Sequence, residues 1–203
     1  MKNNLTAPNK LRARTAAYDL LDELEIRNFP ISPFYVCDYL GIQCHTYAEA
    51  PQFLWPNVNT LKSKHIDGFC YRRGVESVIL YDDSQSHSRI RFTVAHEIGH
   101  LILRHHIAPP DDLPADDPRW AFHKDYKESE ADTFAGALIR PAVLIRMHSI
   151  NDTESIVNGF DVSWECASVG LSISKKFSYN WYLSQHPFFR DCNVRMPAPN
   201  ESA

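Results

Sequence analysis

The pattern H-E-x-x-H at residues 96–100 constrains this chain more than any other feature of its sequence. On a helix, at about 100° per residue, His100 lies about 40° from His96 around the axis and Glu97 lies about 100° from it. The apolar residues of the same run gather on the opposite side, namely Val94, Ala95, Ile98, Leu101 and Ile102. Residues 91–103 therefore predict an amphipathic helix with one face in a core and two imidazoles on the other.

Two imidazoles one helical turn apart are suited to binding zinc, with Glu97 beside them. A catalytic zinc site also needs a third protein ligand and a position open to water. The alternative is a chance match on an ordinary amphipathic helix. The two interpretations differ in what they require of the rest of the chain, because only a metal site needs a further ligand.

A second helix, predicted at residues 126–140, supplies a candidate. Its apolar stripe consists of Ala131, Phe134, Ala135, Leu138 and Ile139. Glu128 falls inside this stripe, where a carboxylate needs a cation, and a metal held by His96 and His100 would be that cation. The alternative is an exposed acidic first turn favoured by the helix dipole, which explains Glu130 better than Glu128.

Asp132 lies one turn after Glu128 on the same predicted helix. A histidine that binds a metal usually donates its other ring N–H to a carboxylate, which orients the ring. We expect Asp132 to accept such a hydrogen bond, with a surface salt bridge as the alternative.

Residues 91–100 (R-F-T-V-A-H-E-I-G-H), residues 128–135 (E-S-E-A-D-T-F-A) and Pro141 resemble the ImmA/IrrE family of metallo-endopeptidases. The resemblance covers residues 66–175. It implies that His96, His100 and Glu128 bind zinc and that Glu97 is the catalytic base. It also implies a cytoplasmic protease of bacteria or mobile elements that cuts helix-turn-helix repressors and so releases gene expression.

His106 is a competing third ligand, because it follows His96 by the spacing of the last histidine in H-E-x-x-H-x-x-G-x-x-H. In that motif a glycine lets the chain turn, and here Leu103 takes its place. We therefore expect His105 and His106 to end the helix, where an imidazolium interacts well with the dipole, and we expect Glu128 to be the ligand.

Composition limits the remaining possibilities. The net charge of −4 gives no general reason to expect nucleic-acid binding. The five cysteines are scattered without C-x-x-C, which indicates reduced thiols in a cytoplasmic protein rather than a disulfide framework. The N-terminus lacks the apolar segment of a secretory signal, and no apolar run reaches the roughly 18 residues that span a bilayer.

Before the metal helix, hydrophobic spacing predicts a helix at 11–27, a short helix at 33–40 that stops at Gly41, and a strand at 42–47. Residues 66–81 predict a β-hairpin. The strand just before the metal helix either presents a sheet edge to an extended peptide or is a core strand. The proline-rich residues 107–118 predict a surface loop, either a lid or a spacer.

After the second helix, residues 160–172 predict a helix capped by Ser163, followed by a turn at Gly170 and another helix to about Ser184. This is a helix-turn-helix outline, but Lys175 and Lys176 stand among aromatic residues rather than further cations. A DNA-reading helix would carry more cations, so we expect packing or substrate docking here and no direct nucleic-acid binding.

Together these observations predict an α+β protein in which a small zincin-like sheet carries the metal helix and a helical subdomain follows. The expected boundaries are 1–145 for the metallopeptidase domain, 146–190 for the helical subdomain and 191–203 for a loosely ordered tail. The expected function is zinc-dependent peptide hydrolysis, with a protein substrate and no membrane partner. The alternative is a non-hydrolytic zinc-binding regulator that senses or sequesters a repressor. Only the protease needs Glu97. Tyr126 and His123 are weak candidates for stabilising an oxyanion.

Overall fold

The computed structural model describes residues 8–50, 58–64, 66–73, 75–105, 119–176 and 186–190. The chain divides into two compact units. Pro33–Asp132 forms one unit, and Met1–Ser32 with Thr133–Ala203 forms the other, so the boundary falls inside helix α5 (Arg119–Ile139). A three-stranded sheet among predominantly helical elements confirms the predicted α+β class.

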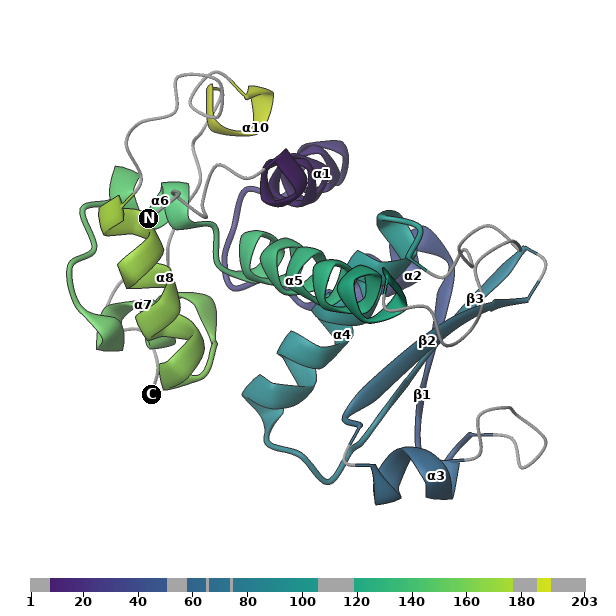
Figure 1. Ribbon diagram of the computed structural model, residues 1–203. Coiled ribbons are helices and arrows are strands. Elements are labelled where there is room, and N and C mark those ends of the chain that lie inside the picture. The colour runs from purple at the N-terminus through teal and green to yellow at the C-terminus, as the bar shows by residue number, and fades with distance from the viewer. Residues whose placement is uncertain are drawn as a thin grey trace. The chain divides into compact units, whose positions relative to one another are not determined.

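The unit at residues 33–132 contains the sheet (Figure 1). Its elements before α5 are α2 (Pro33–Leu40), β1 (Ile42–Thr46), α3 (Val58–Ser63), β2 (Gly68–Arg73), β3 (Glu76–Tyr81) and α4 (His87–Ile102). Helix α2 ends as predicted, because Gly41 adopts a φ of 66° that residues with a Cβ rarely accept. Strands β2 and β3 form the predicted antiparallel hairpin, and β1 pairs with β3 in parallel.

The strand order is β1-β3-β2, which decides between the two interpretations of the strand before the metal helix. That strand is β3, and it is paired on both sides, so it is a core strand. Its central residues, Val78 to Leu80, are buried, as expected for a strand covered on both faces. The edge of the described sheet on the side of the hairpin is β2 instead.

The two faces of the sheet pack against different helices. Cys44, Ile79 and Cys70 lie side by side across the three strands and therefore point to one face. This face meets α2 and α4, which contact β1 and the hairpin respectively. The opposite face carries Val78 and Leu80, which form a cluster with Leu61 of α3 and with Tyr47. The sheet is thus a platform with α4 held against one side.

The unit formed by residues 1–32 and 133–203 is helical among its described residues. It contains α1 (Pro8–Glu23), the end of α5, α6 (Ala142–Met147), α7 (Thr153–Phe160), α8 (Trp164–Lys176) and α10 (Pro187–Arg190). The helix predicted at 11–27 is therefore confirmed as α1, although it ends earlier. Tyr18 of α1 packs edge-on against Phe189 of α10, with ring centroids 4.7 Å apart.

The turn of the helix-turn-helix outline lies between α7 and α8. Asp161 ends α7 in the left-handed conformation, with a φ of 51°, and the Ser163 hydroxyl accepts a hydrogen bond of 3.1 Å from the backbone N–H of Cys166. The predicted cap at Ser163 is confirmed, but the predicted turn at Gly170 is wrong. Gly170 lies inside α8, where a Cβ would collide with the guanidinium of the buried Arg140. Close packing, not a turn, requires this glycine.

Several predictions fall on residues outside the described ranges. They include the loop at 107–118, most of the helix predicted after Gly170, and the tail at 191–203. The division into a metallopeptidase domain and a helical subdomain at residue 145 remains a prediction. None of the described helices is both long and apolar enough to cross a bilayer.

Candidate metal centre

Helix α4 positions the H-E-x-x-H residues as its hydrophobic spacing predicts. Val94, Ala95 and Ile98 are fully buried, whereas His96 and His100 lie partly exposed on another face. Ile102, expected in the buried stripe, is 37% exposed because it stands at the last turn of the helix. The buried side of α4 faces β2 and β3, so the sheet fixes the direction in which the two imidazoles point.

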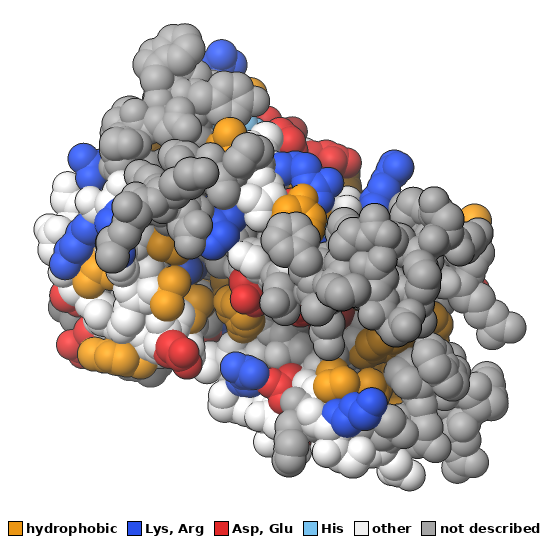
Figure 2. All heavy atoms as spheres, viewed as in Figure 1, with side chains coloured by type: hydrophobic (Ala, Val, Ile, Leu, Met, Phe, Trp, Pro, Cys, Tyr) orange, Lys and Arg blue, Asp and Glu red, His pale blue; other side chains and the backbone are white. Residues whose placement is uncertain are grey.

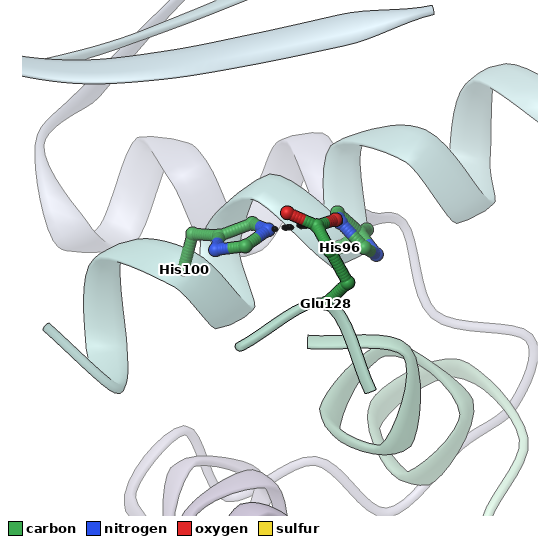
Figure 3. Close-up of side chains that lie close together, drawn as sticks. All are labelled: His96, His100 and Glu128. Atoms are coloured by element: carbon green, nitrogen blue, oxygen red, sulfur yellow. Dashed lines mark hydrogen bonds and ion pairs between the residues drawn. The ribbon is translucent and has the colours of Figure 1, made fainter. Parts of the chain in front are cut away.

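Three side chains from two helices converge at one point (Figure 3). The Nε2 atoms of His96 and His100 are 2.9 Å apart. Oε2 of Glu128, on α5, is 3.2 Å from Nε2 of His96 and 3.6 Å from Nε2 of His100. Their candidate ligand atoms all lie within 4.8 Å of one another. The structure therefore brings together the three residues predicted as ligands.

This arrangement fits a metal ion of the size and preference of zinc. Two imidazole nitrogens and one carboxylate oxygen form the donor set of many catalytic zinc sites. Ligands at about 2.1 Å from a tetrahedral centre stand about 3.4 Å apart, and the three observed separations lie around that value. Glu128 is 48% exposed, so the cluster opens to solvent on the side of α5 and leaves room for a fourth, non-protein ligand.

Asp132 contacts His96 as predicted, with Oδ1 at 2.9 Å from Nδ1 of the ring. Burial lowers the pKa of His96, but its hydrogen bonds with Asp132 and Glu128 outweigh this and raise the pKa to about 10. Hydrogen bonds from His100 and His96 hold the pKa of Glu128 well below its usual range.

Glu97, the predicted base, lies between α4 and the start of β2. It is 7% exposed, and a Cβ at Gly68 would come within 3.4 Å of its Oε1 and collide with Thr93. Gly68 therefore lets the strand approach α4 closely. Burial, followed by the charge of nearby Glu97, raises the pKa of the Cys70 thiol. A neutral thiol and a glycine thus form the strand side of the Glu97 environment.

The structure corrects the expected burial of two glutamates on α5. Glu128, predicted to face the core, is half-exposed, and Glu130, predicted to be the exposed one, is completely buried. Glu130 accepts hydrogen bonds from the Tyr126 hydroxyl at 2.9 Å and from Nε2 of His105 at 2.9 Å. These donors make burial of its carboxylate possible, which an apolar stripe alone does not reveal. A role of Tyr126 in stabilising an oxyanion remains a prediction.

His105 is the residue that sequence reasoning assigned least well. It follows α4, as expected, but instead of serving only the helix end it is 4% exposed and contacts Nδ1 of His100 through its own Nδ1 at 3.0 Å. The spacing of Tyr126 and Glu130, one helical turn apart, could have indicated a buried acceptor. No local pattern links Glu130 to His105. The competing ligand His106 lies outside the described residues.

The three side chains form a cluster able to hold a metal ion, and comparison with known families agrees with this. A family model described as the IrrE N-terminal-like domain of peptidase family M78 matches residues 53–172, more than half of the chain. The chain therefore belongs to the ImmA/IrrE family of metallopeptidases. A search of curated proteins finds no match.

Proposed function

We propose that this protein is a zinc-dependent endopeptidase that acts in the cytoplasm and cleaves a helix-turn-helix transcriptional repressor. The observation that carries the proposal is the convergence of His96, His100 and Glu128 within 4.8 Å, next to Glu97 on α4. A binding protein would need the three ligands only. The presence of a carboxylate one residue after the first histidine favours hydrolysis, because peptide cleavage needs a base near the attacking water.

In the proposed mechanism each residue has one task. His96, His100 and Glu128 would hold the zinc ion, which when bound polarises the scissile carbonyl and acidifies water. Glu97 accepts the proton of the attacking water and returns it to the amine that leaves. Asp132 keeps the ring of His96 oriented through its 2.9 Å hydrogen bond. The close packing of Gly68 on Thr93 and Glu97 holds the base in place.

We propose β2 as the strand along which the substrate lies. Within the described sheet β2 is paired only with β3, so its other edge can accept main-chain hydrogen bonds from an extended peptide. Gly68, at the start of β2, packs close to Glu97, which supports a substrate path along this strand near the proposed base. An extended substrate implies that the cut falls in an accessible or locally unfolded segment of the repressor.

Support for a protein substrate comes from the family and from charge. On the face seen in Figure 2, the described Lys and Arg side chains are scattered among acidic and apolar ones. A net charge of −4 also gives no electrostatic attraction to nucleic acid. The choice of a repressor as substrate, and of the cytoplasm, rests on the ImmA/IrrE resemblance and on the scattered cysteines.

The decisive experiment replaces the base. Glu97→Gln keeps size and hydrogen bonding but cannot accept a proton, so cleavage should fall by several orders of magnitude while zinc content and repressor binding persist. The substrate to use is a helix-turn-helix regulator encoded in a neighbouring reading frame. Cleavage products on a gel, zinc content and a pull-down are measured on one preparation.

Glu76→Gln is the matched control, because Glu76 is exposed on β3 of the same unit. It should cleave like wild type. Wild-type cleavage by Glu97→Gln would refute the mechanism. Wild-type protein that binds zinc and the regulator without cutting it would favour the sequestering regulator instead.

A further inference from the structure

The two candidate histidine ligands are supported differently. His96 contacts a carboxylate directly, whereas His100 contacts a second histidine, His105, which in turn contacts Glu130. The distances along this second path are 3.0 Å from Nδ1 of His100 to Nδ1 of His105 and 2.9 Å from Nε2 of His105 to Oε2 of Glu130. These contacts lie behind the ligand atoms and are not used in the proposed mechanism.

The tautomers of the two histidine rings determine which group donates and which accepts at each step of this path. If His100 binds a cation through Nε2, its proton must sit on Nδ1, which then donates to His105. Nδ1 of His105 must therefore accept, so the proton of His105 sits on Nε2 and is donated to Glu130. The Tyr126 hydroxyl donates to the other oxygen of Glu130 at 2.9 Å. Each of these three hydrogen bonds then has one donor and one acceptor.

The local backbone holds His105 where this path needs it. Arg104 adopts a φ of 61°, which reverses the chain after α4, and the backbone N–H of His105 donates to the carbonyl of His100 at 2.9 Å. The Lys127 ammonium donates to the carbonyl of His105, also at 2.9 Å. The His105 ring is 4% exposed and Glu130 is completely buried, so water competes little for these hydrogen bonds.

We propose that His105 and Glu130 are positioning residues that set the tautomer and orientation of His100 for metal binding. The proposal rests on the metal site of the proposed function, but it concerns affinity for the ion rather than cleavage. In this arrangement His105 is neutral. It accepts a hydrogen bond from His100 and donates one to the buried carboxylate of Glu130. Ligand-orienting partners of this kind typically change metal affinity by roughly 10–100-fold.

The test measures zinc affinity by competition with a chromogenic chelator. His105→Phe preserves a ring but removes the acceptor for His100, so affinity should fall by roughly 10–100-fold. In the His100→Ala background the same substitution should cause no further loss, because its effect passes through His100. The exposed His87 on the same helix provides the control, and His87→Phe should bind zinc like wild type.

A second pair of variants separates orientation from general packing. The amide of Asn reaches about as far as Nδ1 of histidine, and that of Gln about as far as Nε2. His105→Asn can therefore still accept from His100, whereas His105→Gln reaches toward Glu130 instead. We expect His105→Asn to bind zinc more tightly than His105→Gln. This comparison also decides the matter if His105→Phe does not fold.

Equal or reversed affinities of the Asn and Gln variants would overturn the proposal. So would wild-type zinc affinity in a folded His105→Phe, or a full additional loss in the His100→Ala background. None of these results would contradict the proposal that the protein is a protease. That proposal is refuted instead if the wild-type chain binds no zinc or if Glu97→Gln still cleaves the substrate.

Discussion

His96 and His100 stand one turn apart on α4, yet their surroundings differ. The side chain of Asp132, which contacts His96, is 61% exposed. The side chain of His105, which contacts His100, is 4% exposed, and that of Glu130, which contacts His105, is 0% exposed. An exposed carboxylate interacts in a high dielectric and is screened, so it orients its partner at small energetic consequence. A buried pair is unscreened and its loss leaves polar groups in a dry environment. We therefore expect the orientation of His96 to be adjustable and that of His100 to be fixed by the fold.

Among these variants, the largest loss of stability is expected for a substitution of Glu130. Glu130→Met keeps the volume but removes the acceptor of the hydrogen bonds from His105 and Tyr126, and should reduce the free energy of unfolding of the metal-free protein by about 3 kcal/mol. The melting midpoint should fall by roughly 6–12 °C. Calorimetry of the chelator-treated protein measures it. Glu165→Met, at an exposed helical position, should change the midpoint little. Equal losses in the two variants would show that Glu130 stabilises the fold no more than an exposed glutamate does.

A smaller effect is expected at Tyr126. Tyr126→Phe removes the hydroxyl that donates to Glu130 but leaves the contact between Glu130 and His105 intact. The free energy of unfolding should fall by about 1 kcal/mol, and zinc affinity should fall less than in His105→Phe. A loss of zinc affinity as large as that of His105→Phe would show that the path extends to the tyrosine.

The smallest effect is expected at Asp132. Asp132→Asn retains an oxygen that can accept from Nδ1 of His96, and the position is mostly exposed. Stability of the metal-free protein should stay within about 0.5 kcal/mol of wild type, and zinc affinity should fall by less than about tenfold. Chelator competition and thermal unfolding test both. A greater loss of affinity than in His105→Phe would reverse the comparison between the two histidines.

Helical spacing correctly predicted that His96 and His100 share one face of α4, because two residues four positions apart are a local feature, and the structure brings Glu128 to the same point. The same spacing misjudged Glu128 and Glu130. It assigned burial by counting apolar neighbours along α5, whereas Glu130 is buried by donors from Tyr126 and from His105, 25 positions before it. Burial of a charged group depends on its partners, and partners distant in sequence leave no periodic signal.

The glycines show the same difference between local features and contacts with distant residues. Gly41 was interpreted correctly, because a glycine that ends a helix in the left-handed region is a local feature. The sequence predicts a turn at Gly170, but this residue lies inside α8, where a Cβ would collide with the Arg140 guanidinium. Gly68 likewise allows β2 to approach Thr93 and Glu97. Two of these three glycines are explained by a close neighbour, which sequence alone does not name.

The sequence by itself determined the class of the fold, the metal helix and the residues able to hold an ion, because these depend on hydrophobic period, helix ends and side-chain chemistry within short stretches. Only the tertiary structure decided that β3 is central and β2 is the edge, and that His105 returns to His100 with Glu130 behind it. Strand order and buried hydrogen bonds are set by contacts between residues far apart in the chain, where the spacing of residues along the sequence carries no information.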